Sequence, residues 1–293
     1  MPLPIKKISL ADKIYPTLLK EVKGAPQELY YLGHLPQNEP LIAIVGTRKA
    51  TNDGLAVAKT ISYDLAQAGI TIVSGLALGI DAAAHEGALA AGGRTFAVLG
   101  NGVDIVYPHS HYNLAQKILN QNGGILSEYL PGTPPMPHQF LERNRIVSGL
   151  SLAVIVLEAP IDSGALVTAK HALDQGREVF VVPGRAGHQN YEGSHMLLRN
   201  GARIVTSAKD VLEDLAETLA PYNLAAKNET KKAAQDEASL LILETIKNSA
   251  EPLHVDKLVE ITKLDPNVVT QKLTFLTLDG FIEESNGKFR IHQ

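Results

Sequence analysis

Between positions 41 and 220, short hydrophobic runs alternate with longer segments of helical periodicity. Several runs have no alternating polar positions, which is typical of strands buried on both faces. The predicted strands are Leu41–Val45, Thr71–Val73, Thr95–Leu99, Gly124–Leu126, Leu152–Leu157, Glu178–Val182 and Arg203–Val205. The predicted helices are Leu55–Ala68, Asp81–Ala91, Tyr112–Asn120, Leu166–Gln175 and His195–Asn200. Alternation of this kind predicts a Rossmann-like α/β domain with a mostly parallel sheet and helices on both faces.

After position 237 the pattern changes to three short helical segments and a hairpin. The helices are Ala238–Lys247, Asp256–Ile261 and a third that begins at Asp265-Pro266 and continues through Leu278. Asn286-Gly287 between alternating apolar residues is a strong hairpin signal. This succession predicts a small C-terminal winged-helix domain. The chain is thus expected to comprise an N-terminal lead-in that packs on the main domain (1–40), the Rossmann-like domain (41–220), a linker (221–236) and the winged helix (237–293).

Charge changes the interpretation of the C-terminal domain. From Asp236 onward, six Lys and Arg stand against ten Asp and Glu, and the third helix carries only Lys272. A winged helix that reads duplex DNA needs phosphate-binding cations on that helix. We therefore favour a protein-contact or structural module, with duplex readout as the alternative.

Composition excludes several function classes. The chain has 293 residues, of which 45% are hydrophobic and 20% charged, as in folded globular proteins. It has no cysteine, so disulfides, zinc-thiolate sites and thiol nucleophiles are excluded. No apolar stretch has membrane-spanning length and no signal peptide is present, so we expect a soluble cytoplasmic protein. Because the net charge is −4, a nucleic-acid site needs a local convergence of cations.

The first predicted strand is followed by Gly46, Thr47 and Arg48. Ligands of open α/β sheets bind at the carboxyl ends of strands, where backbone N–H groups and a helix N-terminus can face an anion. Arg48 adds a bidentate phosphate donor. The alternative is a tight turn with a surface arginine. The glycine spacing of dinucleotide-binding loops and P-loops is missing, so nicotinamide chemistry and nucleotide hydrolysis lose support.

A loop before the fifth predicted strand carries an aromatic residue, two arginines and an asparagine: Phe140, Arg143, Asn144 and Arg145. From a loop or a first helical turn, both arginines can reach one polyanion. Phe140 offers a stacking surface for an unpaired base. The alternative is that Phe140 belongs to the core and an arginine pairs with Glu142 or Glu158.

Ser163-Gly164 follows the fifth strand as a second anion-accepting element, or alternatively as a helix cap with a small packing residue. Ser163 lacks the surroundings of a nucleophile elbow. Asp81 is interpreted as an N-cap to which His85 bonds back, and a metal site there needs further ligands. We predict no catalytic residue, no metal site and no cofactor.

In their order along the chain, these motifs resemble the DprA (Smf) family, the DNA-processing proteins of bacterial natural transformation. The resemblance runs from about Tyr15 to Leu215. It is carried by Val45-Gly46-Thr47-Arg48, Ser74 to Asp81 with His85, Tyr107-Pro108, Ser127-Glu128, Phe140 with Arg143-Asn144-Arg145, Glu158-Ala159, Ser163-Gly164 with Thr168-Ala169, and Val182-Pro183-Gly184. The family more usually has serine at the position of Thr47, which keeps the hydroxyl.

The resemblance implies a non-catalytic protein that binds incoming single-stranded DNA and helps to load RecA recombinase onto it, with no membrane contact. It also implies the positions of the contacts. Phosphate is gripped at Gly46, Thr47 and Arg48. Phe140, Arg143, Asn144 and Arg145 lie in the DNA-contact loop, and Ser163 and Gly164 border the same pocket.

The resemblance further implies a homodimer formed by the later part of the Rossmann-like domain. We assign His195, Leu198 and Ile204 to this interface, because the apolar side chains around them cannot all face inward on one narrow helical stripe. The alternative is that Ile204 is a buried strand residue.

Two other functions stay open. The fold resembles phosphoribohydrolases that cleave nucleoside monophosphates, but the comparable segment Asp162–Ala169 lacks their glycine run and catalytic glutamate. The chain could also be a scaffold whose anion pocket has lost its function.

Overall fold

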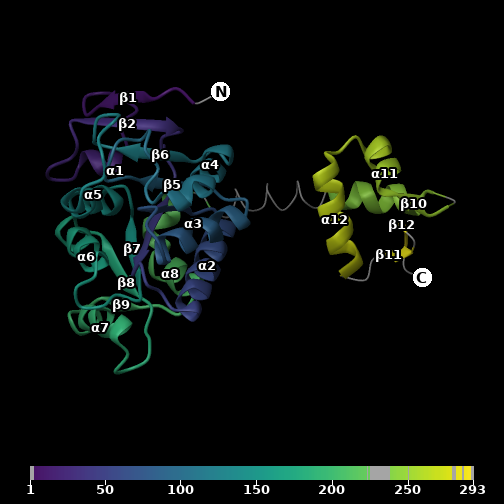
Figure 1. Cartoon of the computed structure of the whole chain (residues 1–293). Helices are drawn as coiled ribbons and strands as arrows, with labels where there is room; N and C mark the ends of the chain where they lie inside the picture. Colours follow the sequence, from purple (N-terminus) through teal and green to yellow (C-terminus); the bar gives the residue numbers. More distant parts are fainter. Residues whose placement is uncertain are drawn as a thin grey trace. The chain divides into compact units, whose positions relative to one another are not determined.

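The computed structural model describes residues 3–222, 224, 238–249, 251–278, 282–285 and 287–291. The chain divides into two compact units, Met1–Leu224 and Ala225–Gln293 (Figure 1). Most of the predicted linker 221–236 lies outside the described residues. In the described part of the chain, no helix has the length and apolar character needed to cross a membrane.

The first unit is built on a nine-stranded sheet with the order β1-β2-β6-β5-β4-β3-β7-β8-β9. Its strands are β1 (Lys6–Ser9), β2 (Glu28–Gly33), β3 (Leu41–Gly46), β4 (Thr71–Ser74), β5 (Thr95–Val98), β6 (Gly124–Ser127), β7 (Ala153–Leu157), β8 (Glu178–Val181) and β9 (Arg203–Ile204). From β3 onward the strands pair in parallel, whereas β1 and β2 extend the sheet antiparallel. Residues 6–33 of the predicted lead-in therefore include two strands of this sheet. The predicted mostly parallel α/β fold is confirmed.

Helices cover both faces of this sheet (Figure 1). One face carries α2 (Asn52–Gln67), α3 (Ile80–Ala90), α4 (Tyr112–Asn120) and α8 (Ala208–Asp214); the other carries α1 (Thr17–Lys20), α5 (Pro137–Gly149), α6 (Gly164–Asp174) and α7 (Glu192–Arg199). Strand β3 illustrates the two-sided burial. Its Ala43 and Val45 belong to the core under α5 and α6, while Ile42 and Ile44 belong to the core under α2 and α3. The uninterrupted apolar runs of the strands follow from this arrangement.

The strand order reverses direction between β3 and β7. From β3 the chain adds β4, β5 and β6 on one side, and then returns to add β7, β8 and β9 on the other. The loops that leave the carboxyl ends of β3 and β7 therefore diverge, which creates a crevice between them.

Helix α5 corrects the expectation of a loop before the fifth predicted strand. Pro137 is its first residue, a position that suits proline, and the Gln139 Oε1 accepts the Met136 N–H at 2.8 Å. The buried face of α5 includes Gln139, Arg143 and Asn144. Because these buried positions are polar, the sequence lacks the apolar periodicity from which a helix is predicted.

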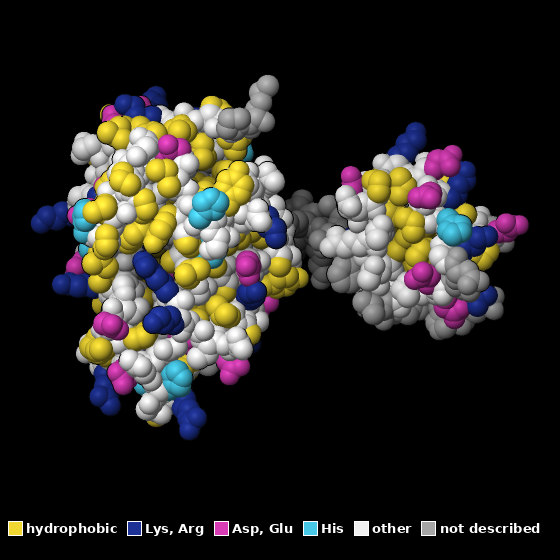
Figure 2. Space-filling model, viewed as in Figure 1, with side chains coloured by type: hydrophobic (Ala, Val, Ile, Leu, Met, Phe, Trp, Pro, Cys, Tyr) yellow, Lys and Arg dark blue, Asp and Glu magenta, His cyan; other side chains and the backbone are white. Residues whose placement is uncertain are grey.

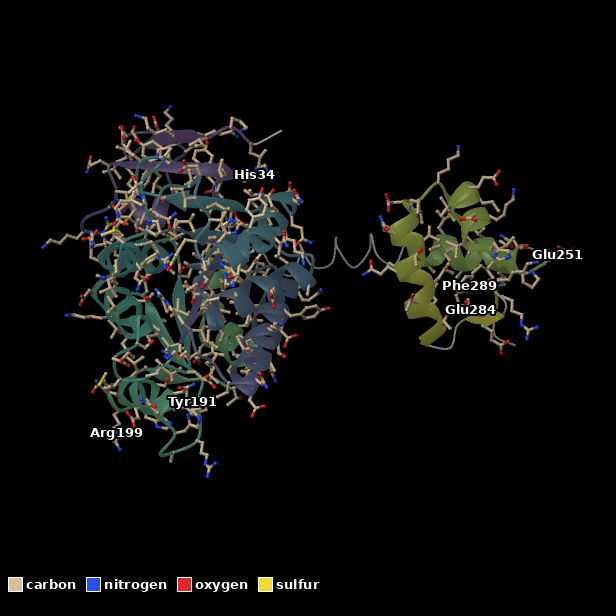
Figure 3. The ribbon with its side chains drawn as sticks, viewed as in Figure 1. His34, Tyr191, Arg199, Glu251, Glu284 and Phe289 are labelled. Carbon is tan, nitrogen blue, oxygen red and sulfur yellow. The ribbon has the colours of Figure 1, made fainter. Side chains whose placement is uncertain are left out.

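The second unit is a winged helix, as the sequence predicts. Its described elements are a helix at residues 238–247, β10 (Leu253–His254), α11 (Val255–Thr262), α12 (Pro266–Leu278), β11 (Ile282–Ser285) and β12 (Lys288–Ile291). Strands β11 and β12 form the predicted hairpin, whose Asn286 lies outside the described residues. Glu284 is paired with Phe289 across the hairpin (Figure 3). Phe289 is buried among Leu258 and Leu273.

Candidate nucleic-acid interface

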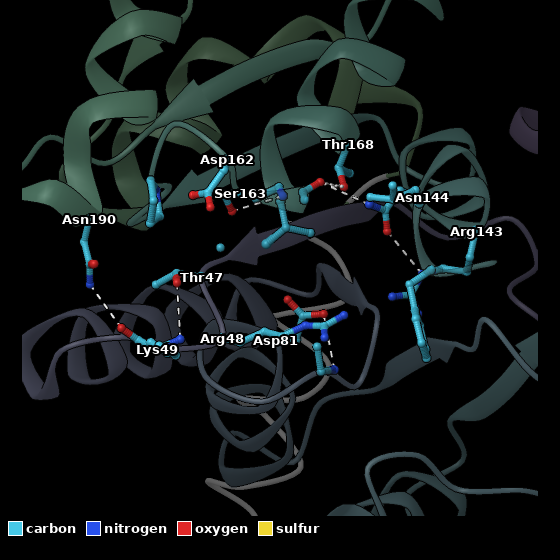
Figure 4. Close-up of a pocket in the computed structure, with 18 of the residues that line it drawn as sticks. Thr47, Arg48, Lys49, Asp81, Arg143, Asn144, Asp162, Ser163, Thr168 and Asn190 are labelled. Carbon is cyan, nitrogen blue, oxygen red and sulfur yellow. Dashed lines mark hydrogen bonds between the residues drawn. The ribbon is translucent and has the colours of Figure 1, made fainter. Parts of the chain in front are cut away.

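A pocket of about 560 Å³ lies between the carboxyl ends of β3 and β7 (Figure 4). Its walls come from the β3–α2 loop, the β4–α3 loop, α5, the loop from β7 into α6, and the 3-10 helix η2 (Gln189–Tyr191). The predicted DNA-contact residues that line it are Gly46, Thr47, Arg48, Phe140, Arg143, Asn144, Ser163 and Gly164. The structure thus gathers every one of the predicted contact residues except Arg145.

Arg143 lines the pocket with a side chain that is only 4% exposed. Its Nη1 donates to the carbonyl oxygen of Gly75 at 2.8 Å and to that of Val98, and its Nε donates to the Asn144 Oδ1 at 3.3 Å. A Cβ on Gly75 would overlap the guanidinium, so any larger residue here would displace Arg143 from its hydrogen bonds. Burial lowers the pKa of Arg143, and the nearby Asp81 carboxylate opposes that shift. Three of its five N–H donors are therefore used in hydrogen bonds within the protein.

Asp81 does not cap α3 as expected, because Gly79 occupies the cap position and Asp81 lies in the first turn. Its Oδ2 accepts the N–H groups of Gly75 at 3.0 Å and Ala77 at 3.4 Å. Burial raises the pKa of Asp81, while the positive charge of Arg143 opposes the rise. The carboxylate holds the β4–α3 loop against the pocket.

His85 bonds to Thr95 and not back to Asp81. Its Nδ1 lies 2.7 Å from the Thr95 Oγ1, whose hydroxyl donates to the carbonyl of Ile72 at 2.8 Å, so the histidine donates to the threonine. Burial lowers the pKa of His85 to about 3, and the ring is neutral. No group of three or more His, Asp or Glu side chains within the described ranges could hold a metal ion.

Arg48 and two aromatic rings form a cluster at the pocket. The Arg48 guanidinium carbon is 5.5 Å from the centroid of the Phe140 ring. Tyr107 is 44% exposed and stacks on Phe140 with a centroid separation of 5.5 Å and an interplanar angle of 28°. Arg48 is exposed and forms no ion pair with any residue that the structure describes. An unpaired cation and a broad π surface therefore meet at one position.

The N-terminus of α6 opens toward the same pocket. Ser163 caps it by accepting the Ala165 N–H at 3.2 Å, so the alternative of a helix cap is confirmed, while a DNA contact by Ser163 stays a prediction. The Asn144 Nδ2 donates to the Gly164 carbonyl at 3.1 Å and so ties α5 to the start of α6 (Figure 4). No acidic residue lies in the first turn of α6, although the exposed Asp162 precedes the cap. A capped helix start without acidic side chains retains an attraction for anions.

The β3–α2 loop is held by hydrogen bonds of its own. Thr47 is buried, its N–H donates to the carbonyl of Glu158 at 2.8 Å, and its Oγ1 accepts the Lys49 N–H at 3.2 Å. The Asn190 Nδ2 donates to the Lys49 carbonyl at 3.1 Å (Figure 4). Arg48 thus projects from a loop whose backbone is fixed on both sides.

Behind this loop lies Glu158, a buried carboxylate at the end of β7. It accepts hydrogen bonds from the Thr51 N–H at 2.8 Å, the Thr51 hydroxyl, the Asn190 Nδ2 at 3.1 Å and the Tyr191 hydroxyl at 2.9 Å. Burial alone would raise the pKa of Glu158, but these hydrogen bonds hold it below its usual range. Glu158 forms no ion pair with any arginine that the structure describes, so that alternative is wrong.

Arg145 lies outside the pocket. Two positions after Arg143 on α5, it forms an ion pair with Glu128 at the end of the neighbouring strand β6. The other suggested partner, Glu142, instead accepts the Tyr129 hydroxyl at 2.7 Å. Residues two apart on a helix do not share a face, so the helical form of α5 separates the two arginines. A DNA contact by Arg145 stays a prediction from the sequence.

The predicted dimer residues lie around α7 and β9, at the end of the first unit marked by Tyr191 and Arg199 in Figure 3. Ile204 is 59% exposed on the edge strand β9, so the alternative of a buried strand residue is wrong. Leu198 and His195 are half-buried, and the His195 Nε2 lies 3.1 Å from the carbonyl of Gly184.

Sequence reasoning did not single out Tyr107, Glu158 or Asn190 as site residues. Tyr107 and Glu158 do stand in motifs that carry the family resemblance. An acidic residue at the end of an otherwise apolar strand was also a usable signal, because buried carboxylates occur where donors converge on them. Asn190 lies in a stretch without periodicity, and no sequence pattern indicated it. The face of the first unit seen in Figure 2 intersperses Lys and Arg with acidic and apolar side chains, and neither this face nor the net charge of −4 pointed to the pocket.

Residues 6–216 match the family described as DNA recombination-mediator protein A, and residues 226–288 match the DprA winged helix domain. The chain is 39% identical over 281 residues to Protein Smf of Escherichia coli, which covers 95% of this chain and 75% of that protein.

Two solved structures are similar. DprA from Streptococcus pneumoniae matches with a TM-score of 0.68 and 40% identity, over 71% of this chain and 74% of that one. DprA from Helicobacter pylori matches with a TM-score of 0.66 and 31% identity, over 74% of this chain and 97% of that one. The Helicobacter structure concerns that protein's binding of single-stranded DNA.

Proposed function

The chain belongs to the DNA recombination-mediator protein A family of DNA-processing proteins, and from that premise we propose that it binds single-stranded DNA in the β3–β7 pocket without catalysing a reaction. The observation that carries the proposal is the meeting of Arg48 and Phe140. A guanidinium free of carboxylates binds a phosphate, and a ring beside it stacks on an unpaired base. The open N-terminus of α6 supplies a second attraction for the backbone.

The carboxylates of the pocket support a binding role over a catalytic one. Asp81 is engaged by two backbone N–H groups beside Arg143, so it is not free to act as a general base. Asp162 is exposed on the loop before α6. Phosphate contacts of this kind carry little sequence preference.

Titration of a labelled oligothymidylate and of its matched duplex tests the proposal. We expect the single strand to bind more tightly, because only unpaired bases can reach Phe140. Affinity should fall between about 50 and about 200 mM salt as counterions are released from the phosphates. Equal affinity for the two forms, or an affinity that does not respond to salt, would contradict a phosphate-and-base site.

Phe140→Leu should reduce single-strand affinity by about 1–2 kcal/mol, or roughly 5- to 30-fold, because it removes the flat π surface but keeps most of the apolar volume. Thermal stability should change little, since the ring is only half-buried. Tyr63→Leu, an exposed aromatic on α2 outside this pocket, is the matched control. A large drop in melting temperature with normal binding would assign Phe140 to the core instead.

We further propose that the chain acts as a homodimer that helps to load RecA recombinase onto the bound strand. The family description as a recombination mediator supports this, as does the exposure of Ile204 on an edge strand. In a two-fold dimer the same patch faces itself, so one introduced charge appears twice. Two binding sites on one strand would also raise the effective affinity.

Ile204→Arg should shift the protein to a monomer in sedimentation, while a single subunit still binds oligothymidylate. Stimulation of RecA assembly on single-stranded DNA should fall together with dimerisation. The exposure of Ile204 makes unfolding an unexpected outcome. A dimer that persists in this variant would locate the interface elsewhere.

A further inference from the structure

The N-terminus of α2 is occupied by a carboxylate of the protein itself, that of Glu158. In a Rossmann-like fold the helix after the first parallel strand is the usual seat for the phosphates of a nucleotide. Here the Glu158 carboxylate takes the Thr51 N–H and the Thr51 hydroxyl, at the cap of that helix. A Cβ on Gly54, in the first turn, would lie 2.5 Å from the carboxylate carbon, so Glu158 is seated directly against the helix start.

This carboxylate is fixed in position. The Tyr191 hydroxyl and the Asn190 amide hold it from the side of η2. Its own backbone has a φ of 32°, in the left-handed region that residues other than glycine rarely adopt. Four hydrogen bonds to one buried carboxylate keep it ionised at neutral pH and leave it no freedom to move aside.

The two helix starts that flank β3 and β7 are therefore unequal. In addition to Glu158, α2 has Asp53 in its first turn, whereas the first turn of α6 has no acidic residue. Gly164 at the start of α6 lines the pocket, and a Cβ placed there would meet nothing closer than 3.7 Å. Although Asp162 precedes the α6 cap, the start of α6 has space for a phosphate, whereas the start of α2 is occupied by the Glu158 carboxylate.

We propose that Glu158 is a specificity-determining residue that acts as a built-in anion and excludes the joined phosphates of nucleoside di- and triphosphates. The inference rests on the proposed function. In a DNA strand a whole nucleoside separates successive phosphates, so a single phosphate position beside Arg48 and Gly164 suffices. A di- or triphosphate needs two or three adjacent positions, and the start of α2, where its additional phosphates would bind, is occupied by the Glu158 carboxylate. The pocket is thereby kept free for DNA in the presence of nucleotides.

Competition by inorganic pyrophosphate tests the proposal on the full chain. Glu158→Ala removes the carboxylate and leaves four donors facing an empty space. Pyrophosphate should raise the melting temperature of this variant. It should also displace bound oligothymidylate at a concentration at least about 10-fold lower than for the native chain, for which it should act only as added salt. Glu158→Gln, which removes the charge but keeps the volume, should show a smaller shift in the same direction.

Glu86→Gln is the matched control, because it removes one negative charge from α3 outside the pocket. If both Glu158 variants respond to pyrophosphate as the native chain does, the proposal is overturned. Weaker DNA binding without any gain of pyrophosphate binding also overturns it, since that result makes Glu158 a support for the loop alone. The gain of pyrophosphate binding is measured from the melting temperature in the absence of DNA. The result therefore does not depend on whether the chain binds DNA. That function fails instead if the native chain does not bind oligothymidylate.

Discussion

Replacing Arg143 with methionine should lower the free energy of unfolding of the first unit by about 3 kcal/mol, because breaking a buried charge interaction leaves the partner uncompensated. Methionine keeps the apolar stem but removes the donors to the carbonyls of Gly75 and Val98. Asp81 then remains buried without a nearby cation. For a unit of this size the melting temperature should fall by roughly 6–12 °C.

Arg199→Met is the control, because Arg199 is an exposed arginine on α7 and surface changes of this kind usually stay within about 0.5 kcal/mol. A melting temperature for Arg143→Met that matches the control would show that the buried guanidinium contributes nothing net to folding.

The loss in free energy of unfolding caused by Arg143→Met should also depend on pH. The pKa of Asp81 is raised in the folded protein, and Arg143 opposes the rise, so its loss raises that pKa further. A carboxyl whose folded-state pKa exceeds its unfolded-state value favours folding at low pH, and this contribution is lost as the pH rises through the folded-state pKa. The loss in free energy of unfolding should therefore be smaller at acidic pH and largest at neutral pH.

Arg48→Ala should weaken single-strand binding by about 1.5–3 kcal/mol, or roughly 10- to 160-fold, the range for a hydrogen bond to a charged group. Arg48 projects from a fixed loop beside the Phe140 ring. One fewer phosphate contact on a single strand should also reduce the slope of log affinity against log salt by about 0.7. Melting temperature should not change, because the side chain is exposed.

Arg199→Ala is the control, because it removes the same charge from α7. It shows how much of the effect of Arg48→Ala comes from the lower net positive charge and how much from a lost phosphate contact. If Arg48→Ala and Arg199→Ala weaken binding equally, only long-range attraction operates and the phosphate contact is absent.

The strands from β3 to β9 were predictable because parallel strands buried on both faces have no polar positions to interrupt them, whereas the antiparallel β1 and β2 of the predicted lead-in were not predicted. The predicted Leu41–Val45 and observed Leu41–Gly46 differ by one residue. Helix α5 was not predictable by the same rule, because Arg143 and Asn144 face inward where apolar residues are expected. The expectation of a loop instead of a helix also let both Arg143 and Arg145 reach one polyanion. In the helix, Arg143 bonds to the carbonyl of Gly75 and Arg145 bonds to Glu128.

The candidate site was predictable where motifs follow strand ends, as at Arg48 and Ser163, because topology alone brings those ends together. Roles within the site required side-chain geometry. No sequence pattern distinguishes an arginine whose donors are consumed by carbonyls from one that is free to bind phosphate. In the second unit, Lys272 of α12 is half-buried, and the exposed residues Asn267 and Gln271 of the same helix are uncharged. The interpretation of this unit as a protein-contact module stays a prediction.

The pocket between β3 and β7 has a thermodynamic consequence for the protein that carries it. Its opposite walls come from segments about a hundred residues apart in the chain, such as Arg48 and Gly164. A ligand that touches both walls binds the folded unit and has no comparable site on the unfolded chain. By mass action, free ligand at a hundred times its dissociation constant stabilises the folded state by about 2.7 kcal/mol. Any ligand that contacts both walls therefore holds the two halves of the sheet together, and resistance to heat and to proteolysis becomes a measure of how much of the pocket is occupied.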